Sequence, residues 1–212
     1  MTDSYITVSD ISCEEIVINK SRFIGLVSPC TDESCAVSFI RKLKDEHRTA
    51  RHHCYAYIIG ENRGIMRYSD DGEPGGTAGL PIMDVLKQKS VVNCCAVVVR
   101  YFGGILLGTG GLVRAYTQAA QLALDSAGIV RMELTGRADC EIPYSCWDRF
   151  RYAAEHLPVR IENVKYAHSV CFQLSYRSAD RDHVFPLLLD SSQRKLNYIL
   201  QEDIFSPWEI SK

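Results

Sequence analysis

A glycine-rich segment, residues 103–111, lies between two arginines, Arg100 and Arg114. Glycines at the head of a helix let backbone N–H groups approach a ligand closely, and the helix dipole favours an anion there. A cation in the first helical turn opposes that dipole, so Arg114 predicts a bound anion or an acidic side chain nearby. In the alternative interpretation, the glycines only permit tight packing and Arg114 pairs with a carboxylate. The glycines of the predicted anion site are Gly103, Gly104, Gly108, Gly110 and Gly111.

The glycine-rich segment matches neither of the common nucleotide-binding motifs. No Lys-Ser or Lys-Thr follows its glycines, as a P-loop requires, and no GxGxxG opens a first βαβ unit. We therefore expect a polyanion, RNA above all, to bind the N–H groups of Gly110 and Gly111, with charge from Arg100 and Arg114. A basic helix end extends this contact if the fold brings it to the same face, and its cations are Lys42, Lys44, Arg48 and Arg51. No cofactor is predicted.

A polar loop, residues 70–79, has a composition that suits either a metal site or an ion pair. Its carboxylates are Asp70, Asp71 and Glu73. Carboxylates so close in sequence can hold a hard cation such as Mg²⁺, although the spacing differs from that of an EF-hand. The alternative is an acidic turn that pairs with Arg100 or Arg114. In both cases we expect this acidic loop to pack beside the glycine-rich segment and to form one site with it.

Two adjacent histidines, His52 and His53, begin a predicted strand at residues 52–59. Neighbouring residues of a strand point to opposite faces, so only one of them can serve any given site. A histidine beside the acidic loop suits a small metal-dependent hydrolase or transferase. The sequence supports that enzyme less, because it shows no nucleophile and base at a recognisable spacing. We therefore include both histidines in the predicted anion site and assign no catalytic residue and no metal ligand.

Hydrophobic patterning predicts the elements that position these residues. The apolar run at residues 96–99 is typical of a strand buried on both faces, and the pattern from Leu112 to Ala127 indicates a helix. A second helix has Pro81 near its first turn, and a third begins after Thr31 or Asp32. The remaining strands of this half are expected at residues 5–9, 14–20, 22–28, 52–59 and 64–69.

The composition changes near residues 131–136, where we place the boundary between domains 1–133 and 134–212. The second half predicts the order strand, helix, strand, strand, helix, strand, which is the ferredoxin-like βαββαβ plan. Pro186 implies a kink or a late start in its second helix. The strands are expected at residues 136–142, 159–166, 168–176 and near 196–204. Nothing in this half has catalytic spacing.

Composition limits the classes of function. The chain has 212 residues, is 46% hydrophobic and carries a net charge of −2, so it lacks the global basic field of many nucleic-acid-binding proteins and any binding patch must be local. None of the nine cysteines forms a CxxC pair, which predicts free thiols in a reducing cytoplasm. No apolar run reaches the about 20 residues of a membrane span. We expect a cytoplasmic α+β protein without a membrane partner, and its oligomeric state is not predicted.

Four blocks of sequence resemble the IMPACT family in its two-domain bacterial form, the YigZ-like proteins. The blocks are residues 20–25, 52–57, 69–79 and 99–116. The resemblance implies a first domain similar to the second domain of ribosomal protein S5 and to domain IV of elongation factor G. It implies a second domain similar to the ferredoxin-like domain V of that factor. Eukaryotic relatives regulate translation through a scaffold protein that they contact with an extra RWD domain, so that partner is not transferred.

Together, the residues and the resemblance predict a non-enzymatic regulatory protein that binds RNA, a ribonucleoprotein or another translation component. One alternative is a small metal-dependent hydrolase or transferase that uses the acidic loop. Another is a protein-binding translational regulator without nucleic-acid contact. The alternatives differ in whether the glycine-rich segment and the acidic loop, the two motif segments, meet in space. They differ also in whether the carboxylates of the acidic loop point into a cleft or onto the arginines.

Overall fold

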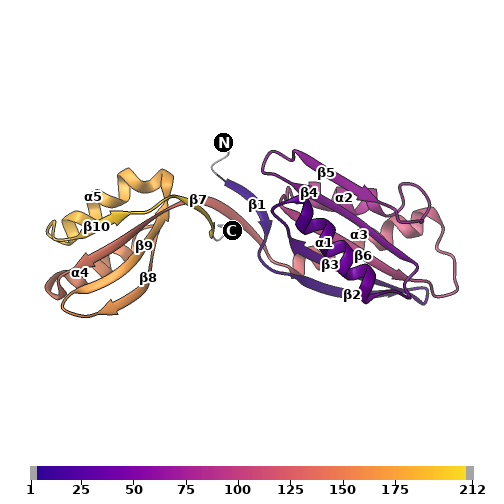
Figure 1. The fold of residues 1–212 in the computed structure, drawn as a ribbon, viewed down its shortest axis with the longest axis horizontal. Coiled ribbons are helices and arrows are strands. Elements are labelled where there is room, and N and C mark those ends of the chain that lie inside the picture. The colour runs from indigo at the N-terminus through magenta and orange to yellow at the C-terminus, as the bar shows by residue number, and fades with distance from the viewer. Residues whose placement is uncertain (1–3, 209–212) are drawn as a thin grey trace. The chain divides into compact units, whose positions relative to one another are not determined.

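The computed structural model describes residues 4–208, and the chain divides into two compact units (Figure 1). The first unit contains the residues up to Arg131 together with Trp208, and the second contains residues 132–207. The division falls inside strand β7 (Ile129–Ile142), close to the boundary expected from the sequence. Both units combine helices with antiparallel sheets, so the chain is α+β as predicted. The independent folding of the two units stays a prediction.

The first unit is built on a five-stranded sheet in the order β2-β3-β6-β4-β5, with antiparallel neighbours. Its central strand, β6, is buried from Cys94 to Arg100, which confirms the strand buried on both faces that the apolar run predicts. Besides β1 (Ser4–Val8), the strands of this unit are β2 (Ser12–Ile18), β3 (Ser21–Pro29), β4 (His52–Ile59), β5 (Ile65–Ser69) and β6 (Cys94–Tyr101).

Three helices cover the two faces of this sheet. Helix α1 (Glu33–Glu46) packs on one face, while α2 (Gly79–Gln88) and α3 (Gly108–Ser126) pack on the other. Alternate residues of β6 therefore enter two cores, with Val97 toward α1 and Val98 toward α2 and α3. Helix α3 approaches β3 closely at Gly25, where a Cβ atom would lie 2.4 Å from the carbonyl oxygen of Ala119. A glycine at this position is therefore needed for the close packing of α3.

Helix α3 begins at Gly108, earlier than the start at Leu112 that the sequence predicts. The end of the glycine-rich segment is helical, although glycine is a poor helix former and Gly108 itself has a φ of 68°. With 3.6 residues per turn, Arg114 lies in the second turn of α3. The expectation that Arg114 opposes the helix dipole from the first turn is therefore wrong.

The second unit follows the predicted strand and helix order. Its strands pair in the order β10-β7-β9-β8, and β11 also pairs with β7. Two helices pack on one face through a core that includes Phe150, Phe172 and Leu188. The second helix starts well before Pro186, so the late start is wrong, and the last predicted strand is two short strands. The elements after β7 are α4 (Tyr144–Glu155), β8 (Val159–Tyr166), β9 (Val170–Arg177), a 3₁₀ turn (Ser178–Asp180), α5 (Arg181–Ser191), β10 (Asn197–Leu200) and β11 (Ile204–Trp208).

Two further expectations concern the whole chain. No helix in the described part of the chain combines the length and the apolar character that crossing a bilayer requires. The nine cysteines are present as unpaired thiols, and most of them are buried. The cytoplasmic location and the redox state in solution stay predictions.

Candidate functional site

The acidic loop is held to helix α2 by Asp70. Its carboxylate accepts hydrogen bonds from three backbone N–H groups, at 2.8 Å from Gly76, 3.0 Å from Ala78 and 2.8 Å from Gly79. Helix α2 has Ala78 at its N-cap and no capping side chain there. Asp70 satisfies the free N–H groups of the helix start instead, and its negative charge is favourable at that end of the dipole. Asp70 is thus a helix cap supplied from an earlier position in the loop.

Asp71 ties the acidic loop to the start of β4 and the end of α1. Its carboxylate accepts hydrogen bonds from the backbone N–H of His53 at 2.7 Å and from the Lys44 ammonium at 3.0 Å. Burial by itself would raise the pKa of Asp71, but these two donors outweigh it and hold the pKa below its usual value. The backbone carbonyl of Asp71 accepts a hydrogen bond from Nδ1 of His52 at 2.8 Å. The other ring nitrogen of His52, Nε2, lies 3.9 Å from the Glu73 carboxylate.

Glu73 forms a buried ion pair with Arg100. One carboxylate oxygen lies 2.6 Å from Nη1 of Arg100 and accepts a second hydrogen bond from the Tyr116 hydroxyl at 2.8 Å. The side chains of Arg100 and Glu73 are only 6% and 4% exposed. The guanidinium also lies over the rings of Phe23 and Phe102, at 5.3 and 5.5 Å from their centroids. Burial, followed by the neighbouring Cys54 and Glu73, raises the pKa of Tyr116, so its hydroxyl stays protonated and donates.

Residues of the acidic loop and of the glycine-rich segment line the same hollow, so the two segments lie beside each other as expected. The contacts of the acidic loop also show what the carboxylates do, because each one binds a different partner from the others. The described residues contain no cluster of histidine, cysteine, aspartate or glutamate side chains suited to a metal ion. The pairing of Arg114 with this loop is wrong, since the ion-pair partners of the loop are Lys44, Arg100 and the two histidines. The geometry favours a loop-locking role for all three carboxylates.

Gly103 fixes the other motif segment against the turn between β2 and β3. Its N–H donates to the Ser21 hydroxyl at 3.1 Å, and a Cβ atom at Gly103 would lie 2.0 Å from the backbone carbonyl carbon of Lys20. The same hydroxyl lies 3.5 Å from Nη2 of Arg100. Three of the four sequence blocks therefore meet around Arg100, and His52 from the fourth lies 3.9 Å from Glu73.

The two motif segments enclose a pocket of about 450 Å³ at the head of α3, which we call the α3 pocket. Only one of the two predicted histidines lines it, as expected for neighbours on a strand. His53 lies on the other face, where burial lowers its pKa and Asp71 partly offsets that effect. The α3 pocket is lined in part by Arg51, His52, Glu73, Phe102, Leu106 and Thr109.

The first turn of α3 reaches this pocket through Gly108 and Thr109, whereas the predicted site residues Gly103, Gly104, Gly110, Gly111 and Arg114 do not line it. Its N-cap, Leu107, makes no side-chain hydrogen bond, and the turn contains no acidic residue. In a helix the N–H groups from the N-cap to the third residue have no partner within the helix, which here means residues 107–110. The N–H of Gly110 is therefore a free donor, whereas that of Gly111 belongs to the helical ladder. Gly104, with a φ of 84°, lies in the loop before the helix, and a Cβ atom added there would meet no other part of the chain within 4 Å.

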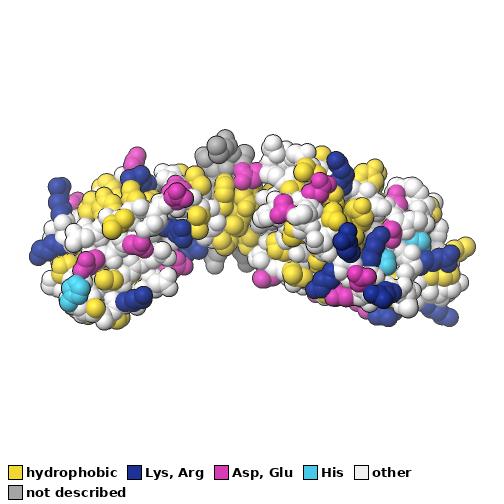
Figure 2. Space-filling model, viewed as in Figure 1, with side chains coloured by type: hydrophobic (Ala, Val, Ile, Leu, Met, Phe, Trp, Pro, Cys, Tyr) yellow, Lys and Arg dark blue, Asp and Glu magenta, His cyan; other side chains and the backbone are white. Residues whose placement is uncertain are grey.

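With a net charge of −2 the chain has no overall basic field, so the cations available to a ligand must be found one by one around the pocket. Figure 2 shows acidic and basic side chains interspersed over the first unit. Most of the predicted basic extension is paired, since Lys42, Lys44 and Arg48 lie within 4 Å of carboxylates. Arg51 and Arg114 are exposed, and neither forms an ion pair within the described residues. Of these two, Arg51 lines the pocket and Arg114 does not, while Arg100, which also lines it, is neutralised by Glu73.

Sequence reasoning missed two residues of this site, Tyr116 and Ser21, and it named Arg51 without its place beside the pocket. Tyr116 was interpreted only as part of the apolar face of a helix, and its hydroxyl is what binds Glu73. Ser21 lies in the first sequence block and carries the bond to Gly103. Arg51 was one cation among several, and only its place before β4 sets it beside the pocket. A polar hydroxyl at an inward helical position was the one available signal, because such groups need a buried partner.

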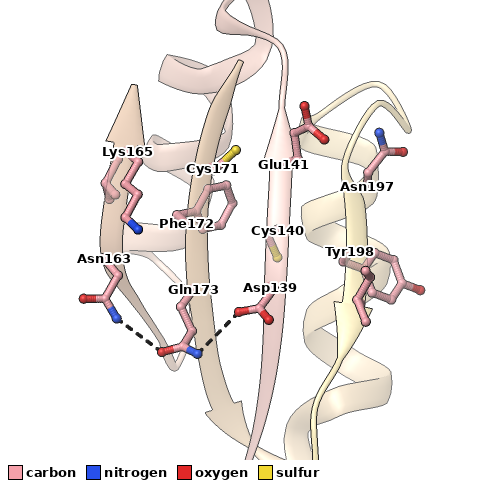
Figure 3. Close-up of a pocket in the computed structure, with 12 residues that line it drawn as sticks. Asp139, Cys140, Glu141, Asn163, Lys165, Cys171, Phe172, Gln173, Asn197 and Tyr198 are labelled. Carbon is pink, nitrogen blue, oxygen red and sulfur yellow. Dashed lines mark hydrogen bonds between the residues drawn. The ribbon is translucent and has the colours of Figure 1, made fainter. Parts of the chain in front are cut away.

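A second hollow, of about 670 Å³, lies on the face of the second unit's sheet that α4 and α5 leave open (Figure 3). Its polar side chains come from neighbouring strands, and Gln173 contacts both Asn163 and Asp139 at 3.4 Å. The charged residues that line it are Asp139, Glu141 and Lys165. None of the predicted site residues lies in this hollow.

The α+β chain that carries this site matches a known group of proteins. The model of the Impact N-terminal domain matches residues 19–124, which include the residues of the loop-locking network. The chain is 41% identical over 173 residues to IMPACT family member YvyE of Bacillus subtilis (strain 168), across 82% of this chain and 80% of that protein. The chain belongs to the IMPACT family.

Other relatives match over a shorter part of the chain. IMPACT family members of Haemophilus influenzae and of Escherichia coli (YigZ) are 50% and 47% identical over 109 residues, which is 50% of this chain and 53% of each relative. A crystal structure of a protein described as hypothetical covers 94% of this chain and 98% of its own, with a TM-score of 0.62 and 31% identity. The fold of the whole chain therefore has a solved counterpart.

Proposed function

We propose that this chain is a non-enzymatic regulatory protein of translation that binds RNA, alone or within a ribonucleoprotein, at the α3 pocket. Membership of the IMPACT family supports the regulatory, translation-associated role. The observation that carries the RNA part is the uncapped first turn of α3, which meets an exposed aromatic ring and an unpaired arginine in one pocket.

In the proposed complex, one phosphate lies at the free N–H groups of Thr109 and Gly110, where the dipole of α3 favours an anion. Arg51 adds a charge-assisted hydrogen bond from the side of β4. Phe102, which is 42% exposed, offers its ring to a base, because stacking on an aromatic side chain tolerates any base. Arg114 is a further contact one turn along the helix. Arg100 holds the acidic loop in place and does not touch the ligand.

Two properties of binding follow from this arrangement. A backbone contact carries no base information, so affinity should depend little on sequence. Few phosphates are contacted, so binding should be weak and should fall as salt rises. We infer as well that the first unit is similar to ribosomal protein S5 domain 2 and that the second is ferredoxin-like. The βαββαβ order and the sheet order β10-β7-β9-β8 support the second assignment.

The test is the affinity of the full chain for a short labelled single-stranded RNA at low salt, followed by fluorescence anisotropy. Arg51→Ala should weaken binding about tenfold, the equivalent of about 1.4 kcal/mol. Because Arg51 and Arg114 are exposed, neither alanine variant should change the melting temperature. Arg149→Ala is the matched control, an exposed arginine on α4 of the second unit. Absence of RNA binding by the wild type, or an equal loss in the control, would contradict the proposal.

A further inference from the structure

Strand β10 has an unprotected edge. In the described part of the chain it pairs with β7 alone, and its four residues are exposed. Ile199 is 71% exposed, and Tyr198 and Leu200 are 39% and 38% exposed. In Figure 2 apolar side chains gather over α5 and β10. Natural proteins usually blunt such edges with charges, proline or a covering loop, so an apolar edge indicates a surface that pairs with another strand.

The hydrogen-bonding groups of this edge can be assigned from the register. The N–H of Gln201 donates to the carbonyl of Arg137 on β7 at 2.8 Å. Antiparallel pairs alternate between hydrogen-bonded and non-hydrogen-bonded, so Ile199, opposite Asp139, also directs its backbone groups toward β7. The N–H and C=O groups of Tyr198 and Leu200 therefore point away from the sheet. These groups of β10, the strand that bears Tyr198 in Figure 3, are positioned to form hydrogen bonds with an added antiparallel strand.

The sequence around β10 is complementary to itself when it is read in the opposite direction. If Tyr198 lies opposite Leu200 of an antiparallel copy, Ile199 lies opposite its own counterpart. Continuing this register beyond the ends of β10 brings Lys195, two residues before the strand, opposite Asp203, three residues after it. Lys195 is exposed and has no ion pair in the described structure, and Asp203 is exposed and accepts a hydrogen bond from Ser178. Opposite charges on facing positions of paired strands are favourable.

We propose that β10 pairs with β10 of a second copy of this chain, forming a symmetric dimer in which the two sheets join edge to edge. A two-fold axis through Ile199 makes the contact isologous, so the Lys195–Asp203 pair forms twice, once from each copy to the other. The side chain of Ile199, the most exposed of the strand, then covers its counterpart. A short strand buries less than the about 1,200–2,000 Å² of a stable interface, so the dimer is weak and depends on concentration.

The carboxylates near β10 argue against nucleic acid as the occupant of this edge. Asp139 and Glu141 line the hollow beside β10, and Glu202 and Asp203 follow the strand. A phosphate backbone along β10 would meet these carboxylates, whereas a second copy brings a lysine to one of them. The dimer contact is independent of the α3 pocket.

Sedimentation velocity of the full chain over a wide range of concentrations tests the proposal. The wild type should show a reversible monomer–dimer equilibrium. Ile199→Lys places two like charges together at the axis and should raise the dimer dissociation constant at least about tenfold. Ile11→Lys, at an isoleucine of the first unit that is 67% exposed, is the matched control and should leave the equilibrium unchanged. A monomer at every concentration, or equal effects of both variants, would overturn the proposal.

A charge exchange then tests the register. Lys195→Asp and Asp203→Lys should each weaken the dimer several-fold, because each puts like charges on facing positions. The double variant restores opposite charges and should return most of the lost affinity. A purely local effect on the fold would make the double variant at least as weak as the single ones. That outcome would overturn the pairing of Lys195 with Asp203.

Discussion

Glu73→Gln is expected to destabilise the first unit strongly, because it removes the charge that neutralises Arg100 while it keeps the shape of the side chain. The two side chains are 4% and 6% exposed, so water cannot replace the lost partner. Removing one partner of a buried ion pair costs about 3–5 kcal/mol. The glutamine oxygen still accepts a hydrogen bond, which places the expected loss near the lower limit, about 3 kcal/mol.

The chain offers a matched control in Glu15→Gln. Glu15 pairs with Arg22 at 2.8 Å, but the side chains of Arg22 and Glu15 are 51% and 40% exposed, so the same substitution should change the free energy of unfolding far less. Hydrogen exchange in increasing urea, read by mass spectrometry, follows peptides of β6 and α3 separately from those of the second unit. Glu73→Leu combined with Arg100→Met should recover most of the loss, because no charge is left buried. If Glu73→Gln and Glu15→Gln lowered the free energy of unfolding equally, the stabilising role of the buried Glu73–Arg100 pair would be refuted.

Two other predictions follow from single contacts. Gly103→Ala should destabilise the first unit by about 1–3 kcal/mol, since its Cβ would collide with the backbone of Lys20, and urea unfolding checks this against the wild type. The pKa of His53 is lowered in the folded chain, so the unfolded chain binds the proton first as the pH drops. The contribution of His53 to the free energy of unfolding is therefore complete above the unfolded-state pKa of about 6.5 and falls as the pH drops from there toward the lower folded-state pKa. His53→Gln should flatten that limb of the stability–pH curve, and an unchanged limb would contradict the assignment.

Much of the fold follows from local patterns in the sequence. The run of β-branched residues in β6 has no polar face, so a strand between two helical layers is the arrangement that buries it. The start of α3 could not be predicted in the same way, because its first turn consists largely of glycine. That turn is helical because packing of the α3 face, including Tyr116 against Phe23, stabilises the whole helix. The split of the last strand depends on pairing with β7, which local pattern does not encode.

The meeting of the two motif segments could be predicted, but not the roles of their residues. Arg100 and Arg114 are equivalent as cations in the sequence, and only the fold buries one beside Glu73 and leaves the other in solvent. Asp70 caps a helix that begins several residues later, because the loop turns back on itself at Gly76. Such choices of partner depend on distances across the tertiary structure. Composition and spacing do not contain those distances.

The central claim is that RNA binds at the head of α3, and amide chemical shifts in the full chain test it most directly. On addition of a short single-stranded RNA at low salt, the amide resonances of Thr109 and Gly110 should shift first, together with that of Phe102. The open sheet face around Gln173 should change little, because acidic groups line it. Shifts confined to that face, or no shift in the first turn of α3, would contradict the account.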